Sequence, residues 1–270
     1  FINFNESKRL ADLIEQICAR KESSITGQGH SLAMSLASSG FSPAAKLIHN
    51  FSGLESIKQI KFIREKISNK EFLNELLEKF KVLHEIILSS PLQLLTITEA
   101  DEQEKAISAL DSLWTSSYNN EDNLTGFYLP KTRVQLTEAW TTSTQVNFCA
   151  KAFPTVPSKN EDNATLHVLA GYLRNGFLHR TIREKGGAYG GGATQDSNSA
   201  SFRFFSYRDP RLTETLDDFD ASLEWLHTAA HENYQLEEAI LGVVAMLDKP
   251  ASPAGEAKQA FYNQLFGNIL

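Results

Sequence analysis

The stretch REKGGAYGGG, residues 183–192, places five glycines around one tyrosine and constrains the fold more than any other part of the sequence. Glycine commonly ends a helix, so the charged helical segment before this stretch should stop there. Two extended segments follow, AYGGGATQ and SFRFFSY, and the turn-rich DSNSA between them is typical of a β-hairpin. A helix that leads into a hairpin predicts an α+β fold, with helices packed on one face of an antiparallel-containing sheet.

The rest of the second half supports this fold class. QVNFCAKAF, residues 145–153, alternates apolar and mostly polar residues, which predicts a half-buried strand. A helix is expected from about 160 to 176, and FLHRTIREK either continues it or begins a new turn. Further helical patterns cover 212–230, 235–248 and 253–266. In the last of these, Ser252 is suited to be the N-cap and Pro253 the first helical residue.

The first half is dominated by helical periodicity. Apolar residues recur at three- and four-residue steps, which predicts helices at 6–20, 28–39, 43–50, 54–67, 70–88 and 101–114. LQLLTIT, residues 92–98, predicts a lone strand. A lone strand cannot satisfy its own backbone groups, so this half resembles a torn piece of an α+β domain, with an exposed edge that favours self-association. Residues 115–144 lack a sustained period and indicate a connection.

Composition excludes several classes of protein. The 270 residues are 41% hydrophobic and 22% charged, as in a globular chain, and no apolar run approaches the roughly 20 residues of a membrane helix. The formal net charge of −7 argues against nucleic-acid binding, which needs a basic surface. The two cysteines, Cys18 and Cys149, form neither a disulfide framework nor a zinc cluster, which favours a reducing compartment over secretion.

Histidine spacing predicts no metal site in this chain. His227 and His231 have the i, i+4 spacing of zinc-binding helices, but no glutamate lies between them to serve as the base. The helical HEIIL at His84 has Leu88 where a second histidine would be needed, and His-x-x-Glu-His occurs nowhere.

Three interpretations of the glycine-rich stretch remain open on the residues alone. It can be a tightly bent β-edge against which a helix packs closely. A phosphate-binding loop is a poorer match, because such loops precede a helix and carry Lys-Ser/Thr after the glycines. The third interpretation is a bare strand that accepts another backbone, with Arg183 and Tyr189 donating hydrogen bonds to its carbonyl groups.

IREKGGAYGGG followed by FRFFSYRDP resembles the C-terminal half of the pitrilysin/insulinase superfamily of inverted-zincin metallopeptidases, in its presequence-protease branch. SITGQGHSLAMSLASSGFSP and LLTITEADEQ are similar to the same branch, so the resemblance covers about residues 5–267. It implies two pitrilysin-type, ferredoxin-like sandwich domains. Residues 1–114 would be the C-terminal part of an incomplete third domain, 115–144 a connection and 145–270 most of a fourth domain, in a fragment of a longer protein.

The resemblance also implies a function. Zinc would be bound by the N-terminal half of the full-length enzyme, so this chain would bind no metal and would be inactive alone. Arg183 and Tyr189 would be catalytic, reaching into the zinc site, and Gly187, Ala188, Gly190 and Gly191 would bind the substrate backbone.

The partners implied are unfolded peptides, such as cleaved targeting presequences, and the N-terminal half of the same polypeptide, with no nucleic acid or membrane. The location implied is a bacterial cytoplasm or an organelle matrix, mitochondrial or plastid. Because the superfamily also contains inactive halves, a scaffold or interaction subunit is the alternative.

Overall fold

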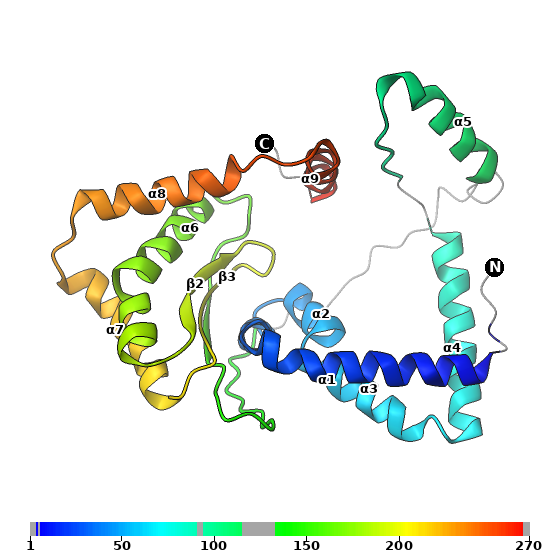
Figure 1. The fold of residues 1–270 in the computed structure, drawn as a ribbon, viewed down its shortest axis with the longest axis horizontal. Coiled ribbons are helices and arrows are strands. Elements are labelled where there is room, and N and C mark those ends of the chain that lie inside the picture. Colours follow the sequence, from blue (N-terminus) through cyan, green and yellow to red (C-terminus); the bar gives the residue numbers. More distant parts are fainter. Residues whose placement is uncertain (1–3, 5, 91–93, 115–132, 267–270) are drawn as a thin grey trace. The chain divides into compact units, whose positions relative to one another are not determined.

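The computed structural model describes residues 4, 6–90, 94–114 and 133–266 (Figure 1). It divides the chain into two units, which are described separately. The sheet unit comprises Ile14–Phe62 and Leu129–Lys249, and the helical unit comprises Phe1–Leu13, Ile63–Tyr128 and Pro250–Leu270. The fold is helix-rich α+β with a small, open antiparallel sheet, which confirms the predicted fold class.

The sheet has three strands in the order β1-β3-β2. They are β1 (Ala150–Pro154), β2 (Gly190–Asp196) and β3 (Ser201–Tyr207), and both neighbouring pairs are antiparallel. The predicted hairpin is therefore confirmed. The strand predicted at 145–153 begins later, and only an isolated bridge between Asn147 and Asp209 precedes it. The ladder stops because Arg208 takes a positive φ of 50°, which turns the chain away after β3.

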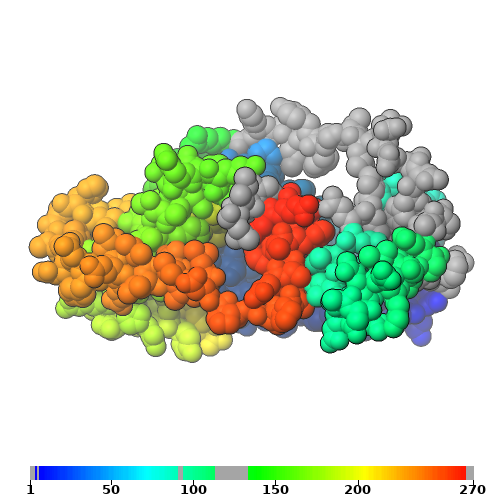
Figure 2. All heavy atoms as spheres, turned by 90° about the horizontal axis from the view of Figure 1, so that it is seen from above, coloured from blue at the N-terminus to red at the C-terminus, as the bar shows by residue number. Residues whose placement is uncertain are grey.

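Helices cover one face of this sheet. α6 (Asp162–Leu173) continues into η2 (Arg174–Lys185), and both pack on β2, while α7 (Thr213–Thr228) packs on η2. α8 (Asn233–Leu247) packs on α6 as an outer layer, and Figure 2 shows its orange spheres uncovered along the helix. The continuation of α6 through FLHRTIREK answers a question that the sequence pattern left open.

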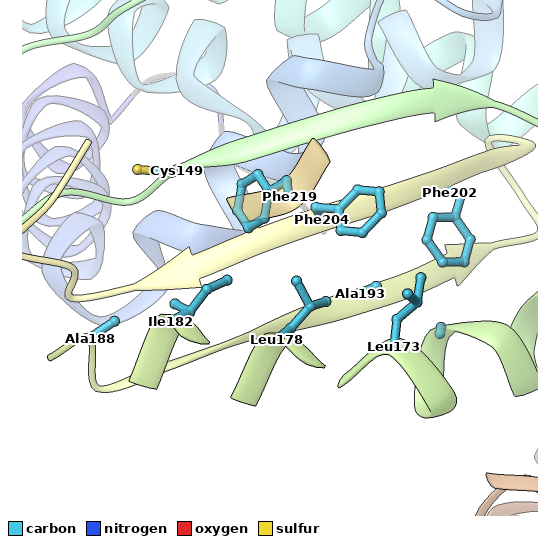
Figure 3. Close-up of a cluster of buried hydrophobic side chains, with 10 residues drawn as sticks. Cys149, Leu173, Leu178, Ile182, Ala188, Ala193, Phe202, Phe204 and Phe219 are labelled. Carbon is cyan, nitrogen blue, oxygen red and sulfur yellow. The ribbon is translucent and has the colours of Figure 1, made fainter. Parts of the chain in front are cut away.

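The core of the sheet unit lies between the sheet and these helices. Leu173, Leu178 and Ile182 point from the helical layer toward the strands, and all three are fully buried (Figure 3). Phe204 of β3 stacks on Phe219 of α7 with 5.6 Å between ring centroids. Burying aliphatic and aromatic side chains of this size contributes about 1.5–3 kcal/mol each, so this cluster holds the sheet and helices together.

The opposite face of the sheet meets α1 (Ser7–Ser38), whose residues from Ile14 onward belong to the sheet unit. α1 is one helix where the sequence predicted two, because the chain stays helical through Gly27 and Gly29. Glycine costs a helix up to about 1 kcal/mol, but the Phe148 ring lies where a Cβ of Gly29 would be. Close packing therefore requires glycine there.

α2 (Pro43–Ser52) and α3 (Leu54–Lys66) follow as predicted, and the Ser42 side chain caps α2 by accepting from the Ala45 N–H.

The helical unit contains α4 (Lys70–Ser89), the 3₁₀ turn η1 (Ala100–Glu102), α5 (Gln103–Trp114) and α9 (Pro253–Phe266). Two of the helices begin at side-chain caps. Asn69 accepts from the N–H groups of Glu71 and Phe72, and Ser252 accepts from the Gly255 N–H, which confirms the predicted N-cap.

The strand predicted at 92–98 is wrong over its described part, because Leu94–Thr98 form no strand; the first two residues lie outside the described residues. No strand occurs in the described part of the helical unit, so this segment has no ladder to join. The expected exposed strand edge, and the self-association based on it, lose their basis. The described part of the predicted connection, 133–144, contains neither helix nor strand.

Candidate substrate-binding site

The helix that leads to the glycine-rich stretch is a π-helix, η2. π-helices are rare, usually last a single turn and are frequent at functional sites. The buried residues Leu173, Leu178 and Ile182 are spaced five and four residues apart, so the wider helix keeps one apolar stripe against the sheet. Arg183 follows this stripe directly and is exposed near the end of the helix. Sequence periodicity predicted a helix here but not its π form.

Arg183 makes one side-chain contact in the described part of the chain. Its Nη1 lies 3.4 Å from Nε2 of His179. The other ring nitrogen of His179, Nδ1, lies 3.5 Å from a carboxylate oxygen of Glu184. Most of the Arg183 donors are therefore left for a ligand, since a guanidinium carries five N–H groups.

Backbone hydrogen bonds fix the turn between Arg183 and Tyr189. The N–H groups of Gly187 and Ala188 donate to the carbonyl oxygens of Arg183 and Ile182, both at 3.1 Å. Gly187 has a φ of 79°, a left-handed conformation that favours glycine, and it reverses the chain toward β2. The Arg211 guanidinium lies where a Cβ of Gly186 would be, so this glycine is also required by close packing.

Tyr189 leaves this turn with an exposed phenol. The residue is 67% exposed, and its hydroxyl has no hydrogen-bond partner among the described residues. Its ring packs edge-on against Tyr207, with 5.5 Å between centroids, and Tyr207 packs in turn against His30 of α1 at 4.9 Å. The Tyr189 N–H donates to the Arg208 carbonyl at 3.3 Å. Backbone and ring are thus held while the hydroxyl remains available.

The structure brings Arg183 and Tyr189 to the two ends of one fixed turn, with no side-chain contact joining them in the described part of the chain. Gly187 is exposed and Gly190 is half-buried with open space around its Cα. Ala188 differs from these glycines, because its methyl group is buried in the core cluster and its N–H is bonded within the turn. Only its carbonyl side can face a ligand.

β2, which contains Gly190 and Gly191, is an edge strand of the described sheet. The Ser206 N–H donates to Cys149, toward β1, and backbone groups alternate sides along a strand. Tyr207 and its partner Gly190 therefore bond to each other across the β2–β3 pair. The N–H and C=O groups of Gly191 and Ala193 consequently point to the open edge.

A buried carboxylate that the sequence analysis missed organises the loop beside Tyr189. Asp209 is fully buried and accepts hydrogen bonds from the Arg211 N–H at 2.9 Å and from the Thr215 hydroxyl at 2.8 Å. The bond from Asp209 to the amide two residues on is an Asx-turn, a recognisable signal in RDPR. Arg211 also pairs with Asp218 at 2.8 Å. This network holds Arg208, whose carbonyl fixes Tyr189.

No group of three or more His, Cys, Asp or Glu side chains able to hold a metal ion occurs in the described ranges. The two ring nitrogens of His231 are occupied by the Tyr172 hydroxyl at 2.7 Å and the Leu226 carbonyl at 3.0 Å. Both cysteines are buried and free, and burial is the main cause that raises the pKa of the Cys149 thiol. None of the helices described is long and apolar enough to cross a membrane.

Two family models match the sequence. Residues 137–269 match the family described as PreP C-terminal domain, and residues 2–65 match a peptidase-associated family of M16 subfamily C. Both descriptions refer to one class of protein, the M16 peptidases.

Curated relatives are similar over almost the whole chain. The mitochondrial presequence protease of Yarrowia lipolytica is 30% identical over 265 residues, which cover 97% of this chain and 27% of that protein. The mitochondrial presequence proteases of Xenopus laevis and Mus musculus are 29% and 27% identical, over 96% and 97% of this chain. The chain spans 27–29% of the length of these three relatives. It belongs to the presequence-protease branch of the M16 pitrilysin/insulinase family and corresponds to the C-terminal half of such a peptidase.

Proposed function

We propose that this chain is a non-zinc-binding part of a zinc metalloendopeptidase and that Arg183 and Tyr189 contact the substrate backbone beside the bond that is cleaved. The observation that carries the proposal is the exposed Tyr189 hydroxyl, which has no partner in the described part of the chain although its backbone and ring are fixed. An immobilised donor without an internal partner suits a ligand carbonyl, because no reorganisation is needed on binding.

The two side chains offer different donors. The Tyr189 phenol can donate one hydrogen bond to a peptide carbonyl oxygen, and the Arg183 guanidinium can supply positive charge together with a planar pair of N–H groups. Negative charge grows on that oxygen as the peptide bond is attacked. Donors aimed at this charge stabilise the transition state more than the bound substrate, which raises the turnover rate.

The substrate lies along β2 in the proposed complex. An extended peptide can pair with the outward groups of Gly191, while Gly187 and Gly190 leave room for its backbone and Ala188 offers its carbonyl. Strands that end at a sheet edge usually carry lysine, proline or a bulge that prevents such pairing. β2 begins with three glycines instead, which favours an edge that accepts a strand.

The remainder of the enzyme supplies the metal in this proposal. Zinc is the cofactor that the M16 family implies, and the described residues of this chain contain no suitable ligand cluster, so we assign zinc to the N-terminal half of the same polypeptide. We retain the division into 1–114, 115–144 and 145–270, with two ferredoxin-like domains of which the first is incomplete. Because the relatives are named mitochondrial presequence proteases, we propose mitochondrial location and unfolded peptides such as cleaved presequences as substrates.

The test is peptide hydrolysis by the full-length protein with Tyr189→Phe, which removes one hydroxyl and leaves the ring. Loss of one donor to a developing oxyanion costs about 2.7–4 kcal/mol, so kcat should fall roughly a hundred- to a thousandfold with unchanged zinc content. Arg183→Lys keeps the charge but loses the planar fork and should also impair turnover. Tyr234→Phe is the matched control, because Tyr234 is 63% exposed on α8.

Wild-type rates for both Tyr189→Phe and Arg183→Lys, at saturating and at limiting peptide, would mean that the pair is structural. A full-length protein that neither binds zinc nor cleaves peptides would instead be the scaffold subunit considered as the alternative.

A further inference from the structure

A row of three side chains on η2 connects Arg183 to two other ionisable groups. His179 stands between Arg183 and Glu184, with its Nε2 3.4 Å from the guanidinium and its Nδ1 3.5 Å from the carboxylate. His179 is the one side chain that contacts the Arg183 guanidinium in the described ranges. We infer that His179 is a positioning residue, which holds Arg183 in the orientation required for its contact with the substrate. The inference rests on the proposed function of Arg183.

The π-helical form of η2 creates this arrangement. A π-helix closes its hydrogen bonds from residue i to residue i+5, so the residues four and five positions ahead stand on either side of a given residue, one turn further along. Arg183 and Glu184 are these two residues for His179. In an α-helix only residues three and four ahead are close neighbours, so Glu184 would turn away from the ring.

The hydrogen bonds determine where the imidazole proton lies. A guanidinium only donates, so Nε2 of His179 must accept from Arg183 and carries no proton. In a neutral imidazole the proton is then on Nδ1, on the side of the Glu184 carboxylate, which only accepts. The ring thus faces positive charge with its acceptor and negative charge with its donor. This orientation is matched at both ends and restricts the rotamers of Arg183.

Restricting Arg183 matters because arginine has a long side chain with large rotamer freedom. His179 is 45% and Glu184 60% exposed, so each contact alone is weak. We therefore expect a loss of severalfold, rather than the larger loss expected when a donor to the substrate is removed.

A double-mutant cycle in the full-length enzyme tests the inference. The variants are His179→Leu, Arg183→Ala and the double variant, and kcat and KM are measured for each. His179→Leu should lower kcat/KM roughly 2- to 12-fold, the range for one hydrogen bond, and should cause no further loss when Arg183 is already alanine. His179→Gln should recover most of the activity, because its amide oxygen can accept from Arg183 near the position of Nε2.

The control is His227→Leu, the same change at an exposed histidine of α7, and it should keep wild-type kcat/KM. If Arg183→Ala is impaired but His179→Leu costs the same factor with and without Arg183, or costs nothing, the positioning role is wrong while the proposed function stands. If Arg183→Ala itself has wild-type kcat/KM, both proposals fail. Equal losses for His179→Leu and His179→Gln would also contradict a hydrogen-bonding role.

Discussion

Leu178 and Leu83 occupy equivalent positions in the sequence patterns of two helices, yet the structure treats them differently. Leu178 of η2 is fully buried in the sheet unit, whereas Leu83 of α4 in the helical unit is 52% exposed. The same contrast holds for the two units. The sheet unit has a contiguous core around Phe204 and Phe219, while Ile67 is the one buried apolar residue among the described residues of the helical unit.

The contrast separates the formation of a helix from its burial. α4 has an N-cap at Asn69 and an ion pair between Glu75 and Lys79, so its helical form is supported locally. Its large apolar side chains nevertheless face solvent in the described structure: Phe80, Val82, Leu83, Ile86, Ile87 and Leu88. An amphipathic pattern therefore predicts a helix and a face to be covered, but burial also requires a partner surface.

The largest expected effect compares the same substitution at the two leucines. Leu178→Ala should lower the free energy of unfolding of the sheet unit by about 2–5 kcal/mol, because it leaves a cavity in a packed core. Leu83→Ala should cost less than about 1 kcal/mol, because its side chain is already half in water. Hydrogen exchange of the β3 amides in the two variants measures both effects. A loss of similar size for Leu83→Ala would show that the apolar face of α4 is covered after all.

A smaller effect concerns the backbone of the sheet unit rather than its core. Gly187→Ala should destabilise this unit by about 1–2 kcal/mol, because an L-residue is strained at a φ of 79° although the nearest side-chain atom, on Pro210, is 3.6 Å away. Gly190→Ala is the control, since its Cβ meets open space and its φ is not positive. Urea unfolding checks both. Equal stability of the two variants would mean that the turn relaxes without cost.

The smallest expected effect is a dependence on pH that arises in the sheet unit. Burial, followed by the nearby Lys46, lowers the pKa of His49, against the opposing charges of Glu138 and Glu55, and burial also lowers the pKa of His30. A lowered folded pKa means that the unfolded chain takes up the proton first. The stability should therefore be complete above the unfolded pKa of about 6.5 and should decrease as the pH falls below it.

Urea unfolding at about pH 7.5 and about pH 5.5 measures this dependence. His49→Gln should make the dependence shallower, with the remainder due to His30 and other groups. An unchanged slope in this variant would show that His49 titrates alike in the folded and unfolded chains.

Local and short-range signals were sufficient for much of the fold and for the candidate site. Serine and asparagine caps, proline at the first helical position and three-to-four periodicity predicted most helices, because a helix satisfies its own backbone hydrogen bonds. The hairpin was predictable from its turn residues, because β2 and β3 are neighbours in sequence. The glycines around Tyr189 likewise mark exposed backbone, and the motifs REKGGAYGGG and SYRDP are sufficient to recognise the family.

Tertiary structure alone decided the features that depend on distant partners. Periodicity suggested a strand at 92–98, but a strand requires a ladder, and the described part of that unit has none. α1 continues through Gly29 because Phe148, more than a hundred residues later, packs against it. The π-helical form of η2 brings His179 between Arg183 and Glu184, and the buried Asp209 holds the loop beneath Tyr189. Local residue preferences carry no information on such contacts, because their energy arises only when segments far apart in the chain meet.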